Sequence, residues 1–139
     1  MYERLLVAVD HSPSTERVLA AARELARLSD GEVWVVHVRE RDVVGRAGGL
    51  IDTETAAAAQ QEVDAAVTVL AGAGVKAHGE VRHAIQGYAA REIIDSAGQH
   101  NAGVIVMGSK GWGDLAGLLL GSTAHKVIHL ADRAVLVVR

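Results

Sequence analysis

A glycine-rich segment at residues 108–122 is the part of the sequence best suited to chemistry. It contains five glycines and ends in Gly121 and Ser122, where a helical pattern begins. Phosphates carry negative charge and several acceptor oxygens, so backbone N–H groups can hold them where no Cβ stands in the way. The unpaired N–H groups and the dipole at a helix N-terminus favour an anion as well. The segment therefore predicts a phosphate-binding loop.

Two common phosphate motifs do not describe this segment. A Walker loop closes on Gly-Lys followed by Ser or Thr, whereas Lys110 is followed by Gly111. The dinucleotide fingerprint belongs after the first strand, where this chain has Asp10 followed by His, Ser and Pro. Lys110 is placed either to reach a phosphate or to remain a solvated loop charge. A phosphate site of another type is expected.

Short aliphatic runs alternate with helical patterns along the chain, and these elements must position the loop. The aliphatic runs lack alternation, which is typical of strands covered on both faces. Strands are predicted at residues 5–9, 33–38, 75–83, 104–107 and 134–138. Helices are predicted from Pro13, with Ser12 as N-cap, to about Asp30, at 53–70 with Asp52 or Thr53 as cap, at 88–96 and at 122–131.

This alternation predicts an α/β fold. We expect one domain over residues 1–139, built on a five-stranded parallel sheet of order 3-2-1-4-5, Rossmann-like, with helices on both faces. In such a sheet, a ligand lies beyond the carboxyl ends of the strands at the point where the winding direction reverses. Asp10 ends the first strand and Gly108 ends the fourth, so both should face one crevice. Residues 39–53 show no period and are predicted to form a mobile surface loop, a candidate lid.

The spacing of the glycines carries a more specific signal. Two residues separate Gly108 from Gly111, nine separate Gly111 from Gly121, and Ser122 follows. In this spacing the chain resembles the universal stress proteins, specifically their ATP-binding branch, whose signature it matches without a gap. The likeness also covers Asp10 after the first aliphatic run, the pair His37 and Val38, and the terminal run Ala134–Val138.

The resemblance implies an adenine nucleotide alpha hydrolase-like fold that binds ATP, with AMP and cyclic AMP as alternatives and Mg²⁺ possible beside ATP. Asp10 would hydrogen-bond the ribose or adenine side. Ala8, Val9 and Val38 would line the base pocket; Gly108, Gly111, Gly121, Ser122 and Thr123 would hold ribose and phosphates, with Met107 nearby and Lys110 within reach. No side chain is assigned to a metal. The resemblance further implies a homodimer through Ala134–Val138.

Two classes of function remain open. In the first, the protein is a binding module that senses or stores adenine nucleotide in a stress response and signals to partners by ordering residues 39–53. In the second, it is a slow Mg²⁺-dependent ATPase or phosphotransferase, for which a water-positioning residue is needed. Asp114 is the only candidate base that the loop offers. We therefore favour binding, with no catalytic residue assigned.

Two other groupings of reactive side chains are weaker. Asp10, His11 and Ser12 name the members of a hydrolase triad, but adjacent residues cannot point at one another as that chemistry requires. His125 and His129 are spaced to share a helix face, as in zinc sites, yet no third ligand is evident. His37 is expected to pack at the end of its strand.

The composition excludes several other kinds of site and argues against nucleic acid as a partner. The chain has no cysteine, which excludes disulfides, thiolate metal sites and cysteine nucleophiles. Its net charge is −3 and its basic residues are scattered, so nucleic acid is not expected as a partner. The apolar run near the N-terminus meets Asp10 too early for a signal peptide or a membrane span. We expect a soluble, cytoplasmic protein.

Overall fold

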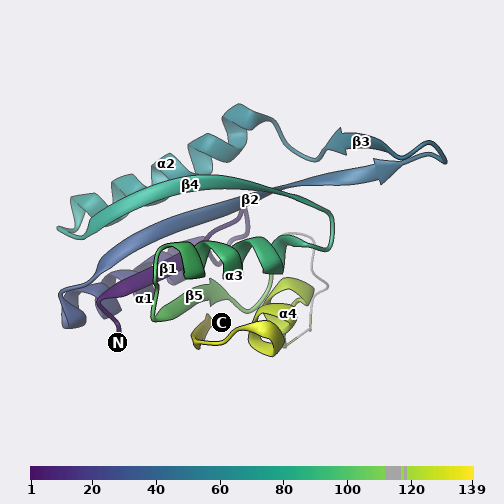
Figure 1. Ribbon diagram of the computed structural model, residues 1–139. Coiled ribbons are helices and arrows are strands. Elements are labelled where there is room, and N and C mark those ends of the chain that lie inside the picture. Colours follow the sequence, from purple (N-terminus) through teal and green to yellow (C-terminus); the bar gives the residue numbers. More distant parts are fainter. Residues whose placement is uncertain (112–116, 118) are drawn as a thin grey trace.

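The aliphatic runs form the centre of one sheet in the computed structural model, which describes residues 1–111, 117 and 119–139 (Figure 1). Strands and helices alternate along most of the chain, as expected of an α/β fold. The strands are β1 (Arg4–Ala8), β2 (Glu32–Val44), β3 (Gly49–Asp52), β4 (Lys76–Ile85), β5 (Val104–Gly108) and β6 (Ala134–Val138). The helices are α1 (Thr15–Ser29), α2 (Ala56–Gly72), α3 (Ala89–Gln99) and α4 (Ser122–Leu130).

The sheet is parallel apart from β3. β1 lies between β2 and β5, β6 follows β5, and β4 pairs with the other edge of β2. The parallel strands thus lie in the order β4-β2-β1-β5-β6, which confirms the predicted α/β fold and the predicted order of its five strands. The predicted strand count is wrong, because β3 pairs antiparallel with the far end of β2 and makes the sheet six-stranded.

Side chains of the central strands alternate between two cores. Leu5 and Val7 of β1 face a core shared with α1 and α2, whereas Leu6 faces a core shared with α3 and α4. Both cores are closed to solvent, so each central strand must be apolar on both of its faces. This burial explains why the strands appear in the sequence as unbroken aliphatic runs.

Residues 39–53 form a β-hairpin and not the predicted loop. β2 continues to Val44, the chain turns through Gly45 and Gly48 with φ of 76° and 70°, and β3 returns along it. Glycine adopts such positive φ values without a steric penalty. In Figure 1 the hairpin extends beyond the rest of the sheet. Its apolar side chains Val43, Val44, Leu50 and Ile51 are exposed, so no hydrophobic period marks the hairpin in the sequence.

The helix caps also differ from the prediction. α1 begins at Thr15 with Ser14 as N-cap, so Ser12 and Pro13 belong to the preceding turn. The N-cap of α2 is Thr55, whose hydroxyl accepts a hydrogen bond from the Ala58 N–H at 3.0 Å. The predicted caps Asp52 and Thr53 are instead bonded to residues 39–41 of β2. Within the described residues, no helix has both the length and the apolar character needed to cross a bilayer.

Candidate functional site

The carboxyl ends of β1 and β5 and the middle of β2 border a cleft with an inner and an outer part. The inner cavity has a volume of about 90 Å³, and the outer part about 660 Å³. Asp10, His37, Val38 and Thr123 contribute to the walls of both parts. The cleft therefore lies where the winding of the sheet reverses, the place at which open α/β sheets bind ligands.

The structure brings nearly all of the predicted site residues to this cleft. The inner cavity is lined by Ala8, Val9, Asp10, Val38, Met107, Gly108, Lys110, Gly111 and Thr123, and the outer part by Ser122. Gly121 lines neither part but is the N-cap of α4, directly before Ser122. Asp114 lies outside the described residues. The contacts of these residues with a nucleotide remain a prediction.

The inner cavity is mainly apolar. Besides the predicted Ala8 and Val38, it is bordered by Val36 of β2, Ile93 of α3 and Ala124 of α4. These side chains come from the core between the sheet and helices α3 and α4. Apolar walls with a few polar groups are the usual surroundings of a bound small molecule. The cavity can accept a flat, apolar ring with a polar edge.

Asp10 is held in a tight turn between β1 and α1. One of its carboxylate oxygens accepts a hydrogen bond from the Ser12 N–H at 2.8 Å, and its carbonyl accepts one from the Thr15 hydroxyl at 2.7 Å. The Ser12 hydroxyl is hydrogen-bonded to the Ser14 hydroxyl at 2.8 Å. From the sequence, Asp10, His11 and Ser12 were not expected to form a catalytic triad. The hydrogen bonds of Asp10 and Ser12 instead hold the turn together.

Gly108 lies where a side chain would crowd the start of α1. A Cβ at this position would lie 2.8 Å from the Ser14 hydroxyl oxygen and 3.3 Å from the Lys110 carbonyl oxygen. The first of these distances is shorter than Cβ atoms tolerate, so a larger residue here would require the Ser14 side chain to move. The glycine thus brings two elements of the cleft together.

Backbone hydrogen bonds tie both ends of the glycine-rich segment to the sheet. The Ser109 N–H donates to the carbonyl of Val138 at 2.8 Å, and the Gly121 N–H donates to the carbonyl of Ser109 at 2.6 Å. The N-terminus of α4 is thereby fixed beside the end of β5. Because the first N–H groups of a helix have no partner within it, this arrangement can hold an anion in the cleft.

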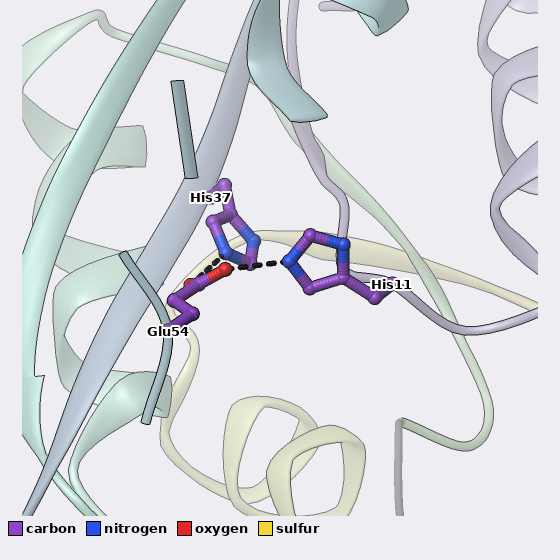
Figure 2. A group of neighbouring side chains, drawn as sticks. All are labelled: His11, His37 and Glu54. Atoms are coloured by element: carbon purple, nitrogen blue, oxygen red, sulfur yellow. Dashed lines mark hydrogen bonds and ion pairs between the residues drawn. The ribbon is translucent and has the colours of Figure 1, made fainter. Parts of the chain in front are cut away.

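Three side chains that the sequence analysis did not combine meet at the outer cleft. His37 of β2 is 4% exposed; its Nδ1 lies 2.8 Å from the Val9 carbonyl oxygen and its Nε2 lies 2.5 Å from a Glu54 oxygen. The other Glu54 oxygen lies 2.5 Å from Nε2 of His11. Figure 2 shows both rings directed at the one carboxylate. His37 is buried, but it lies in the middle of β2 and not at the strand end that was expected, because β2 continues to Val44.

The cluster changes the ionisation of its members. Burial works against the charged form of Glu54, but its hydrogen bonds with His11 and His37 prevail and lower the pKa of its carboxyl. The hydrogen bond with Glu54 raises the pKa of His11, although burial opposes this shift. Glu54 is therefore a carboxylate at neutral pH.

The sequence contains no local signal for this cluster. Glu54 lies between β3 and α2 in a segment without period, and His11 and His37 belong to separate elements. In the described part of the chain, these three are the group of side chains close enough to share a metal ion. His125 and His129 do share a face of α4, where their rings stack 6.5 Å apart.

Comparison with known proteins assigns the family. The universal stress protein family model matches residues 1–139. Universal stress protein A homolog 1 of Coxiella burnetii is 32% identical and covers 99% of this chain and 96% of its own, and universal stress protein YxiE of Bacillus subtilis is 32% identical over the whole of both chains. The structure of the universal stress protein from Archaeoglobus fulgidus in complex with dAMP is 28% identical, with a TM-score of 0.73, over 99% of this chain and 98% of that one. With its fold, its glycine spacing and these matches over its full length, the chain belongs to the universal stress protein family.

Proposed function

We propose that this protein binds an adenine nucleotide, ATP foremost, and acts as a nucleotide-dependent sensor or regulator in a stress response. The observation that carries the proposal is the position of the signature residues: Gly108 and Gly111 line the cleft, and Gly121 and Ser122 begin the helix at its edge. The dAMP complex of the Archaeoglobus fulgidus relative supports adenine as the base.

Each part of the cleft suits one part of the nucleotide. The adenine ring would enter the inner cavity against Ala8, Val9 and Val38, with the Asp10 carboxylate at the base or ribose. The phosphates would lie at the start of α4, where unpaired N–H groups and the helix dipole favour an anion. The hydroxyls of Ser122 and Thr123 can donate to phosphate oxygens, and Lys110 adds a positive charge. Met107 would close the cavity from β5.

The identity of the nucleotide can be determined directly. Mass spectrometry of the nucleotide that copurifies with the protein, followed by calorimetric titration with ATP, AMP and cyclic AMP, should show the tightest binding for ATP with Mg²⁺. This order is expected because ATP brings the most phosphate charge to the start of α4 and to Lys110. Absence of measurable binding for all three ligands would contradict the proposed function.

We also propose that binding, and not turnover, is the main activity. Two of the acidic side chains in the described part of the cleft are already hydrogen-bonded: Glu54 to the histidines and Glu40 to the Gly87 N–H at 3.3 Å. Purified protein should therefore leave Mg-ATP largely intact over minutes, as measured by chromatography of the nucleotides. Turnover on the order of 1 per second, which is typical of enzymes, would instead favour the ATPase alternative.

The edge strand β6 supports a homodimer. β6 pairs with β5 on one side and ends the sheet, and Leu136 is 39% exposed. An exposed apolar edge invites pairing with a second strand. We expect the wild type to sediment as a dimer and Leu136→Glu as a monomer, because the charge would have to be buried at the interface. Leu28→Glu, on the exposed side of α1, should remain dimeric; a monomeric wild type would contradict this prediction.

A further inference from the structure

The cluster of His11, His37 and Glu54 has an arrangement that nucleotide binding does not require. In each histidine ring, Nδ1 faces one oxygen and Nε2 faces Glu54. For His37 the oxygen at Nδ1 is the Val9 carbonyl, 2.8 Å away, and for His11 it is a Glu62 carboxylate oxygen, 3.1 Å away. Since a carbonyl can only accept a hydrogen bond, Nδ1 of His37 carries a proton.

In both histidines, Nε2 is therefore the ring nitrogen that could bind a metal ion. A histidine that ligates a metal almost always donates its other N–H to a carbonyl or a carboxylate, which fixes the tautomer and the ring orientation. His37 has the first kind of partner, and the Glu62 carboxylate forms an ion pair with Nδ1 of His11 at 3.1 Å. We propose that His11, His37 and Glu54 form a binding site for one divalent transition-metal ion of the zinc type at the wall of the cleft.

The distances suit this proposal. The candidate ligand atoms lie within 4.8 Å of one another, and the two rings are 5.2 Å apart with an interplanar angle of 70°. Ligand atoms around a tetrahedral zinc ion with bonds of about 2.0 Å are separated by about 3.3 Å. Each contact of 2.5 Å between Nε2 and Glu54 would need to widen by less than about 1 Å to admit the ion.

The donor types favour zinc over the hard divalent cations. Two imidazoles and one carboxylate suit zinc, whereas Mg²⁺ and Ca²⁺ prefer oxygen ligands throughout. Three protein ligands leave the fourth position of a tetrahedral ion open. All three side chains line the outer cleft, so this position would be available to water or to a ligand bound in the cleft.

Zinc chloride added to the metal-stripped, nucleotide-free full-length protein provides the test. Calorimetry should show one zinc ion bound per chain, and cobalt chloride should give the intense visible absorption of tetrahedral Co²⁺. His11→Gln, at a side chain that is 40% exposed, should keep the fold and weaken zinc binding by at least about 100-fold. Glu62→Ala, which removes only the carboxylate beside Nδ1 of His11, should weaken it about 10-fold to 100-fold.

The histidine pair on α4 provides the matched control. The double variant His125→Gln, His129→Gln removes two histidines spaced four residues apart and should bind zinc as the wild type does. Equal zinc affinity in His11→Gln and the wild type, or loss of binding in the α4 double variant, would overturn the proposal. So would the absence of stoichiometric binding to the wild type. Because no nucleotide is present, the result is independent of the proposed function.

Discussion

Replacing Gly121 with valine is expected to weaken the binding of adenine nucleotide by at least about 100-fold while the domain stays folded. Gly121 is the N-cap of α4, with φ of −73° and ψ of 169°, a conformation that any L-residue adopts. The backbone can therefore accept valine without strain. The branched side chain would instead occupy the space through which the phosphates reach the first N–H groups of α4.

Isothermal titration of the valine variant with ATP, together with circular dichroism, measures both parts of this prediction. Gly72→Val is the matched control, since a Cβ at Gly72 has nothing within 4 Å and the residue ends α2. The control should bind ATP as the wild type does. Wild-type affinity in Gly121→Val would show that the phosphates do not approach the start of α4, and the proposed position of the nucleotide would be wrong.

Leu6→Ala is expected to lower the free energy of unfolding by about 2–5 kcal/mol. Leu6 is 0% exposed on β1 and lies opposite Trp34 of β2 and Ile105 of β5. Truncation removes buried apolar surface and leaves a cavity that the central strand cannot easily close. Because a domain is typically stable by about 5–15 kcal/mol, this one change would remove a large share of the total.

Urea denaturation followed by circular dichroism measures this loss. Leu28→Ala makes the same chemical change on the solvent side of α1, where the residue is 81% exposed, and should stay within about 0.5 kcal/mol of the wild type. A loss below about 1 kcal/mol in Leu6→Ala would mean that the core around β1 relaxes around the missing side chain. Since β1 also carries Ala8, a destabilised β1 should weaken nucleotide binding as well.

The sequence by itself determined the α/β fold and the place of the cleft. Central strands covered on both faces must be aliphatic throughout, so β1 and β5 are visible as short apolar runs. The glycine spacing is also a local signal, because a side chain at Gly108 would collide with the Ser14 hydroxyl at the start of α1. Parallel pairing then brings the ends of β1 and β5 to the same edge of the sheet.

Only the tertiary structure decided the hairpin of β2 and β3 and the cluster of His11, His37 and Glu54. The apolar side chains of the hairpin are exposed, so its residues follow no hydrophobic period, and its pairing depends on backbone hydrogen bonds that any side chain permits. Glu54 reaches the two histidines because that hairpin returns the chain to the end of β1. Contacts between residues 43 and 17 positions apart in the sequence leave no local pattern, and so they arise only when the chain has folded.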